Sequence, residues 1–305
     1  NADDIKIECP VCQSADFVGL NFKNEKRTAF TEVIEPAGFA VDLFKTPTRV
    51  INSRKKPQYL EPLLVNLDPW NKQQQSIIEI RTSNAQEDAE VLFYNMGEGN
   101  GYSLCLDCGR VETSNEALEG HKRLRGGKRE NDNAECASTS VRDKIVLGAR
   151  IKTDFSEIRL LDKNGEFIKD EKLLYSLGVV LSKTFTSYLG IEENEIGFGV
   201  NKYSGFSTLF FYDSARGGAG FSTQLGMHLN EVIEQSMSFL QKCDCEDACT
   251  KCLVDRNSQW HLNLLDRHIA IEWLKFATDK SIPDEVKKEF KSDVFTILGN
   301  LSNEI

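Results

Sequence analysis

Hydrophobic residues change their spacing at about residue 145, and this change predicts two kinds of structure. Before this point, short apolar runs at 30–44, 76–82 and 89–97 are broken by Pro, Gly and Asn. Such runs predict β-strands joined by long loops. Two alternating runs within 144–161 predict further strands, arranged as a hairpin or otherwise paired.

A helical repeat follows this strand-rich part. Apolar and aromatic side chains recur three and four residues apart between Leu173 and Tyr188. This spacing predicts a buried helix that ends near Gly190. Residues 195–201 and 207–214 are then typical of core strands.

The C-terminal part predicts further helices. The glycine-rich turn "DSARGGAGF" at 213–221 ends a strand and opens a helix. Another helix is expected to begin at Leu264. "SIPDE" at 281–285, with Pro283 near the first turn, opens an amphipathic tail helix that would pack on a partner surface.

Length and composition fit a protein with a sizeable core. A chain of 305 residues suggests two domains more readily than one. Its 40% hydrophobic and 28% charged residues are ordinary for a globular protein. No apolar run approaches the roughly 18 residues of a membrane span, and the opening "NADDIKIE" does not resemble a secretory signal. We therefore expect a cytoplasmic protein with no membrane partner, and the missing initiator methionine predicts a piece of a longer polypeptide.

The nine cysteines indicate metal binding. An odd number without a secretion signal argues against a disulfide framework. Cys9 and Cys12 form one C-x-x-C pair, and Cys105 and Cys108 form another, followed by Gly109. Together they predict one four-cysteine zinc site built around a long insertion. Two independent buried pairs, or a redox pair, are the alternatives.

A second cluster follows the pattern C-x-C-x3-C-x2-C and comprises Cys243, Cys245, Cys249 and Cys252. Four thiolates this close in sequence predict a structural zinc site, because a full set of protein ligands leaves no open position for water. An iron–sulfur cluster is the alternative, since it takes the same ligands. The two clusters together predict two structural zinc ions per chain.

Cys136 is the ninth cysteine. It is expected to be either a buried core thiol or a substitute metal ligand paired with His121.

Charge allows only local contact with nucleic acid. The formal net charge of -10 argues against a basic coat. Residues 121–129, "HKRLRGGKR", nevertheless contain five basic side chains and no acidic one, namely Lys122, Arg123, Arg125, Lys128 and Arg129. This stretch predicts either a phosphate-binding loop or a merely solvated one. The turn at 213–221 predicts either an anion site beside Arg216 or only a tight turn.

A helicase motor would need a G-x-x-x-x-G-K-[ST] loop, and the chain has none. The chain is therefore not expected to be an enzyme by itself.

Six sequence blocks occur in an order that resembles the MrfA-type zinc-binding (MZB) family. They are "EPAGFAVD" at 35–42, "QYLEPLL" at 58–64, "LCLDCGRVE" at 104–112, "LGARIKTDFSEIRL" at 147–160, "LFFYDSARGGAGF" at 209–221 and "CLVDRNSQWHLNLLDRHIA" at 252–270. This family occurs at the C-terminal end of certain superfamily-two DNA helicases and in DrmB-like components of DISARM anti-phage systems. The resemblance implies that the cluster at 243–252 binds structural zinc beside a helicase that acts in DNA repair or phage defence. The family pattern has a proline in the glycine turn and a tyrosine and an asparagine after the cluster, whereas this chain has Arg216 and the run 256–259.

These observations predict an α+β protein of three regions. They are a β-rich region with split zinc knuckles (1–145), an MZB-like α/β zinc-binding domain (146–280) and a C-terminal amphipathic helix (281–305). The expected function is that of a non-catalytic accessory domain of a DNA helicase, whose motor lies in cis or in trans. The basic stretch, with Arg256 and Arg267, is expected to contact the DNA backbone weakly and without sequence preference. The alternative is an acidic protein-interaction scaffold that docks the motor or a defence partner.

Overall fold

The computed structural model describes residues 33–36, 60–65, 77–85, 90–97, 100–123, 135–136, 140–203 and 206–279. The chain divides into two compact units, and neither is one continuous stretch. Unit 1 comprises 1–19, 62–91 and 151–305, and unit 2 comprises 20–61 and 92–150. Strands and helices are both present in the described residues, so the predicted α+β class is confirmed.

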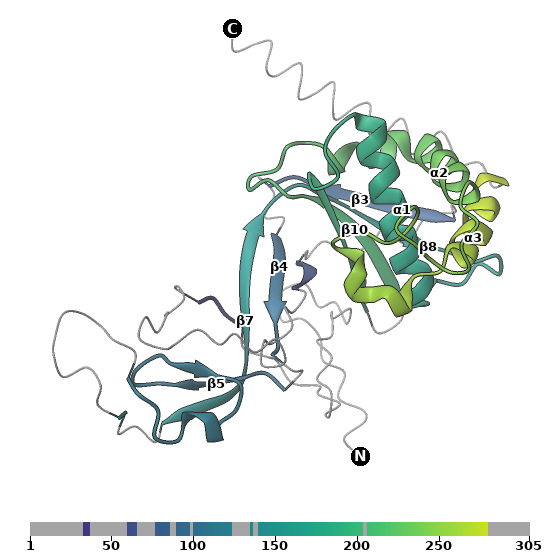
Figure 1. The fold of residues 1–305 in the computed structure, drawn as a ribbon. Coiled ribbons are helices and arrows are strands. Elements are labelled where there is room, and N and C mark those ends of the chain that lie inside the picture. The colour runs from purple at the N-terminus through teal and green to yellow at the C-terminus, as the bar shows by residue number, and fades with distance from the viewer. Residues whose placement is uncertain are drawn as a thin grey trace, which may run out of the picture. The chain divides into compact units, whose positions relative to one another are not determined.

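Unit 1 contains a four-stranded antiparallel sheet in the order β3-β8-β10-β9 (Figure 1). Its strands are β3 (Ile78–Ser83), β8 (Phe155–Leu160), β9 (Ile196–Lys202) and β10 (Ser207–Asp213). The inner strand β10 is buried along its whole length. β9 and β10 confirm the two core strands expected on either side of residue 204, and β3 confirms the strand expected at 76–82.

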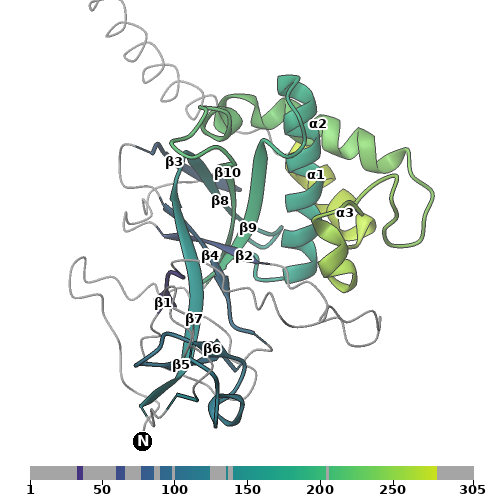
Figure 2. The ribbon, with the colours of Figure 1, turned by 60° about the vertical axis from the view of Figure 1, so that its left-hand side comes forward.

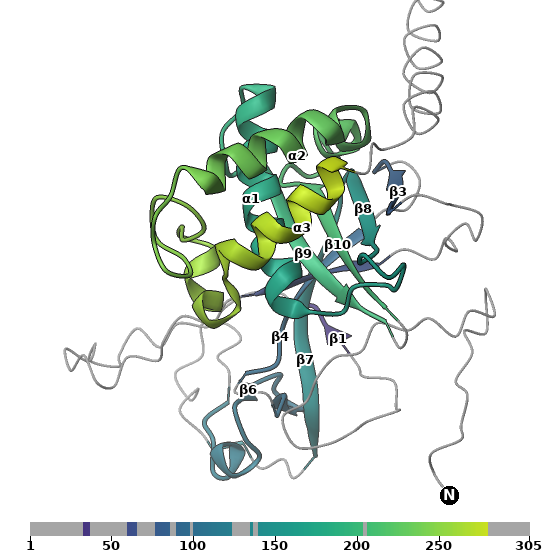
Figure 3. The same cartoon turned by 90° about the vertical axis from the view of Figure 1, so that its right-hand side faces the viewer.

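Helices cover one face of this sheet (Figures 2 and 3). α1 (Glu171–Leu189) lies against β9 and β10, and α2 (Leu225–Gln241) and α3 (Arg267–Asp279) pack on α1. Residues at alternate strand positions meet the helices, as a period of two requires. They form one apolar core that includes Ile158, Leu160, Leu209 and Phe211.

Local signals explain where α1 begins and ends. Asp170 caps its first turn, because its Oδ1 accepts the N–H of Lys172 at 2.9 Å. Gly190 ends it with a φ of 70°, a left-handed conformation that glycine adopts without steric cost. At Gly178 the helix approaches Phe198, where any Cβ would lie only 2.4 Å from the ring. The predicted helix with its end near Gly190 is confirmed.

The opposite face of the sheet carries a buried polar network. Glu157 is fully buried and accepts hydrogen bonds from Arg81 Nε at 2.7 Å, from the Tyr203 hydroxyl at 3.1 Å and from Thr208. Burial, together with the nearby Glu157 charge, raises the pKa of Tyr203. A charge so deep in a protein is tolerated only when it is paired and hydrogen-bonded.

A second ion pair and a further strand flank this network. Arg159 pairs with Glu79 and lies 4.2 Å from the ring centroid of Phe167. β2 (Glu61–Val65) is joined to the unit by Asn201, whose side chain makes hydrogen bonds to the N–H and C=O of Leu64 at 3.1 and 2.9 Å.

Unit 2 is built around a long strand, β7 (Val141–Lys152). Its other strands are β1 (Val33–Ile34), β4 (Glu90–Asn95), β5 (Tyr102–Cys105) and β6 (Val111–Glu112). β5 pairs antiparallel with both β6 and β7, whereas β1 pairs parallel with β7. A short 3₁₀ helix, η3 (Glu116–Leu118), follows β6.

Two sequence-based expectations about elements are wrong. The runs within 144–161 form strands, but they are not a hairpin, because β7 pairs with β5 whereas β8 pairs with β3 and β10. The helix expected to begin at Leu264 begins at Arg267 instead, because the preceding residues form a 3₁₀ helix, η5 (Ser258–Leu264), and Asp266 caps the α-helix.

The expected tail helix at 281–285 and beyond lies outside the described residues. No helix among the described residues is long and apolar enough to cross a bilayer.

Candidate metal centres

The four clustered cysteines of unit 1 bring their sulfurs together in the loop that follows α2. Their Sγ atoms all lie within 4.8 Å of one another. Cys243 Sγ lies 3.5 Å from the sulfurs of both Cys245 and Cys249, and Cys252 Sγ lies 3.6 Å from Cys245 Sγ. Four thiolates around one zinc ion at about 2.3 Å would stand roughly 3.8 Å apart. The geometry therefore fits a single tetrahedral ion.

Backbone amides of the same loop donate to these sulfurs. The N–H of Cys249 donates to Cys252 Sγ at 3.3 Å, and that of Lys251 donates to Cys249 Sγ at 3.4 Å. The N–H of Cys245, with the Cys249 thiol second, lowers the pKa of Cys243 to about 7. Amides that favour the thiolate also favour metal binding, since a cysteine must lose its proton to become a ligand.

Two cations from distant elements hold the cysteine loop in place. Arg267, at the start of α3, donates through Nε to the carbonyl oxygen of Cys245 at 2.6 Å. Lys183 of α1 donates through Nζ to the carbonyl oxygen of Cys252 at 3.0 Å and lies 3.4 Å from Asp255 Oδ2. Both cations contact backbone carbonyls of ligand residues, so they fix the loop and not the ion.

A family model of the MrfA Zn-binding domain matches residues 177–253. That stretch runs from α1 through β9, β10 and α2 and ends one residue after Cys252. Residues 177–253 resemble an MrfA-type zinc-binding domain and are called the MrfA-type domain below. The resemblance stated from the sequence blocks is thus confirmed, and the domain ends on its four cysteines.

Two curated proteins are similar to parts of this chain. Druantia protein DruE of Escherichia coli is 23% identical over 209 residues, which is 62% of this chain and 11% of DruE. Uncharacterized protein MJ1572.1 of Methanocaldococcus jannaschii is 28% identical over 91 residues, which is 28% of this chain and 81% of that protein. The chain thus corresponds to about a tenth of the length of DruE.

Solved structures of a DUF1998 helicase, MrfA, are among the structures that match this chain. The crystal structure of MrfA bound to DNA has a TM-score of 0.42 at 13% identity and covers 73% of this chain and 26% of that chain. Another crystal structure of MrfA has a TM-score of 0.32 at 14% identity and covers 64% of this chain and 22% of that chain.

The glycine-rich turn of the MrfA-type domain already holds two carboxylates. Asp213 accepts the N–H groups of Ala219 at 2.6 Å, Phe221 at 3.1 Å and Ser222 at 2.7 Å. Asp154 accepts the N–H of Gly220 at 2.8 Å. The amides of Gly217 and Gly218 donate to the carbonyls of Lys152 and Ala215.

Every amide from 217 to 222 thus donates within the chain. Of the two readings of this turn, the one without a bound anion is the better supported, because internal carboxylates stand where a phosphate would lie.

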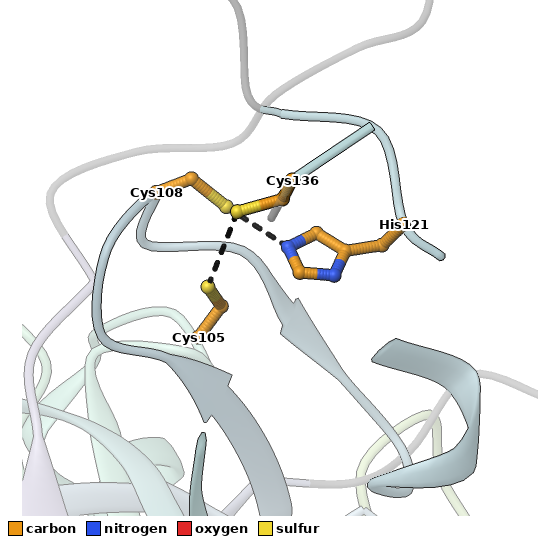
Figure 4. Close-up of side chains that lie close together, drawn as sticks. All are labelled: Cys105, Cys108, His121 and Cys136. Carbon is orange, nitrogen blue, oxygen red and sulfur yellow. Dashed lines mark hydrogen bonds between the residues drawn. The ribbon is translucent and has the colours of Figure 1, made fainter. Parts of the chain in front are cut away.

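A second cluster lies in unit 2 and involves Cys105, Cys108, His121 and Cys136. Their ligand atoms all lie within 4.8 Å of one another, and Figure 4 shows the four side chains pointing toward one another. Cys105 Sγ lies 3.8 Å from Cys136 Sγ, and Cys108 Sγ lies 3.2 Å from His121 Nε2. All but Cys108 are buried.

The protonation of this second cluster is strongly perturbed. Burial opposes ionisation of Cys105, but the N–H groups of Cys108 and Asp107 outweigh it and lower the pKa of Cys105 to about 6. The pKa of His121 is raised, chiefly because the carbonyl of Leu118 accepts a hydrogen bond from its ring. Perturbed groups gathered at one point are typical of functional sites.

The remaining predicted site residues fall into two groups. Cys9, Cys12, Arg125, Lys128 and Arg129 lie outside the described residues. Lys122 and Arg123 in unit 2, and Arg216 and Arg256 in unit 1, are exposed. Arg267 differs from them, because its guanidinium is half-buried against the cysteine loop.

The sequence did not reveal the roles of three residues. Lys183 holds the cysteine loop, and Asp154 and Asp213 accept the amides of the glycine-rich turn. Asp213 ends β10 and Asp154 directly precedes β8. An acidic residue at the boundary of a strand is common and does not by itself indicate a special role. The glycines of 217–220 were the available signal for Asp213, because a turn that exposes several amides needs an acceptor.

We expect the Arg267→Ala variant to lose part of its zinc affinity and thermal stability, because the Cys245 carbonyl loses its charged donor. A buried hydrogen bond to a charged group is worth roughly 1.5–3 kcal/mol. The measurement is competition with a zinc chelator together with thermal unfolding. Arg256→Ala, also in this domain but exposed, is the matched control and should behave like the parent. Equal zinc affinity in all three proteins would contradict this role for Arg267.

Proposed function

We propose that this chain is a zinc-stabilised, non-catalytic accessory domain of a DNA helicase. The observation that carries this proposal is that the sulfurs of Cys243, Cys245, Cys249 and Cys252 lie within 4.8 Å of one another at the end of the MrfA-type domain. Zinc held by four thiolates has no open position for water or substrate, so it stabilises the fold and performs no hydrolysis.

The helicase context is inferred from the family. The family that the sequence blocks resemble occurs with superfamily-two helicase motors, and this sequence contains no G-x-x-x-x-G-K-[ST] loop. The motor is therefore proposed to lie elsewhere on a longer polypeptide or on a partner, and the role to be in DNA repair or phage defence. The similarity to DruE spans 62% of this chain but only 11% of DruE, which fits a module within a longer protein.

Contact with DNA is proposed to use local positive charge on an acidic protein. Within the described residues, exposed cations stand at Lys122 and Arg123 in unit 2 and at Arg216 and Arg256 in unit 1. The chain's net charge of -10 repels a polyanion at long range. Binding should therefore be weak, independent of base sequence and steeply dependent on salt.

The test is fluorescence anisotropy with single-stranded and duplex oligonucleotides at low salt. We expect a parent affinity that falls as salt rises, with each neutralised phosphate adding about -0.9 to the slope of log affinity against log salt on a duplex. Changing Lys122, Arg123, Arg125, Lys128 and Arg129 together to alanine should reduce both the affinity and the slope. A matched variant with alanine at five lysines on exposed sites of unit 1 controls for the change in net charge. These are Lys163, Lys169, Lys172, Lys242 and Lys251.

Two outcomes would favour the alternative of an acidic protein-interaction scaffold. One is a parent that fails to bind DNA at about 50 mM salt, and the other is a five-residue variant that binds as well as the parent. The zinc-dependent fold would stand in either case, because it depends on the cysteine loop and not on these cations.

A further inference from the structure

We propose that Cys105, Cys108, His121 and Cys136 of unit 2 bind one zinc ion as a Cys₃His site. The family match ends at residue 253 and begins at residue 177, so this cluster lies wholly outside it. The ligands come from four places in the chain, namely the end of β5, the turn that follows it and two segments beyond η3.

The first two ligands stand in a knuckle between β5 and β6. The N–H of Gly109 donates to the carbonyl of Cys105 at 2.9 Å, and the N–H of Cys105 donates to the carbonyl of Arg110 at 2.9 Å. Gly109 has a φ of 74°, which closes the turn. This turn directs both thiols to one side, as a two-thiolate half of a zinc site requires.

The other two ligands are joined to each other through the backbone. The N–H of Cys136 donates to the carbonyl of His121 at 2.8 Å, and the adjacent residues Lys122 and Glu135 form an antiparallel bridge. The side chains of His121 and Cys136 therefore reach the knuckle together, although 14 residues separate them in sequence (122–135).

The imidazole of His121 is oriented as a metal ligand. Its Nδ1 lies 2.5 Å from the carbonyl oxygen of Leu118. A carbonyl can only accept a hydrogen bond, so Nδ1 carries the proton and Nε2 presents its lone pair. That lone pair points to the thiols, with Cys108 Sγ 3.2 Å away. A backbone carbonyl that holds the far ring nitrogen is the usual support of a zinc-bound histidine.

The spacing of the four donor atoms favours a single zinc ion over an iron–sulfur cluster. Four atoms within 4.8 Å of one another fit around a single ion, whereas a two-iron cluster would spread its ligands over two centres. Three thiolates and one imidazole in a closed tetrahedron are typical of structural zinc. The set is complete without Cys9 and Cys12, so these two cysteines are not required as partners of Cys105 and Cys108.

The test measures metal content by plasma emission spectrometry on the full 305-residue chain, with cobalt(II) substitution as a second readout. We expect two equivalents of zinc in the parent and a loss of one equivalent in His121→Ala and in Cys136→Ser. The matched control, Cys9→Ser with Cys12→Ser, should keep the parent content. His121→Cys should keep two equivalents, and the cobalt absorption should shift to that of two four-thiolate sites.

Three results would overturn the assignment. They are parent-level metal in His121→Ala, loss of an equivalent in the Cys9 and Cys12 double variant, and an unchanged cobalt spectrum in His121→Cys. The last variant keeps a complete ligand set, so its spectrum reports on ligation even if His121→Ala fails to fold. None of these results depends on DNA binding, so they are separate from the test of the proposed function.

Discussion

The Cys249→Ser variant is expected to release zinc from unit 1 and to lose the cooperative unfolding transition of that unit. Cys249 Sγ lies 3.5 Å from Cys243 Sγ and 3.8 Å from Cys252 Sγ, so its loss opens the ligand set. Structural zinc contributes on the order of 10 kcal/mol of apparent folding free energy in small modules, which equals or exceeds the net stability of a typical domain. The measurements are zinc content and thermal unfolding followed by circular dichroism.

Thr250→Ser is the control for this variant. Thr250 is the exposed neighbour of Cys249, and its change leaves all four thiols in place. A Cys249→Ser protein that melts cooperatively near the parent temperature would show that the zinc is not structural.

The Asp213→Ala variant should lose on the order of 4 kcal/mol of unfolding free energy. Asp213 is fully buried, and its removal leaves three amide donors in the glycine turn without their acceptor. Hydrogen bonds to a charged group are worth roughly 1.5–3 kcal/mol each, and a buried donor without a partner adds a desolvation penalty. The measurement is urea unfolding, compared at equal m-values so that the difference reports stability.

Asp162→Ala provides a matched control for the Asp213 variant. Asp162 also accepts two backbone amides, from Asn164 at 2.8 Å and Glu166 at 2.9 Å, but these lie on the surface, where water replaces a lost acceptor. Its loss of stability should be much smaller. Similar losses in the two variants would mean that burial of the Asp213 carboxylate is unimportant.

Features determined by neighbours in the sequence were predictable. The cysteine cluster of the MrfA-type domain closes within ten residues, so its spacing alone indicated a cage. Helix α1 carried both its apolar repeat and its terminal glycine. The strands β9 and β10 were likewise evident, because each is short, apolar and bounded by turn residues.

Features determined by contacts between distant segments were not predictable. Nothing in the sequence of β3 shows that it pairs with β8, about 75 residues later, and the contiguous runs of β7 and β8 suggested a hairpin. β7 and β8 do not form a hairpin because the two residues between them make hydrogen bonds elsewhere. The Thr153 hydroxyl donates to the carbonyl of Asp213 at the end of β10, and Asp154 accepts the N–H of Gly220 in the glycine-rich turn.

Choosing the partner of Cys105 and Cys108 raised the same difficulty. A second C-x-x-C pair was the conspicuous candidate. Among the described residues, the structure brings Cys136 and His121 to this pair, the combination that the sequence offered only as an alternative, whereas Cys9 and Cys12 lie outside those residues.

The strand order of unit 1 determines which fragments of this chain can be produced on their own. β10 is one of the two inner strands, and its partner on one side, β8, lies outside residues 177–253, as does the next strand, β3. A fragment cut at the limits of the family match would leave the apolar strand β10 as an unpaired edge, which invites association with other chains. It would also lack Arg267, which holds the cysteine loop. A fragment that folds alone therefore has to include residues 77–85 together with 151–279.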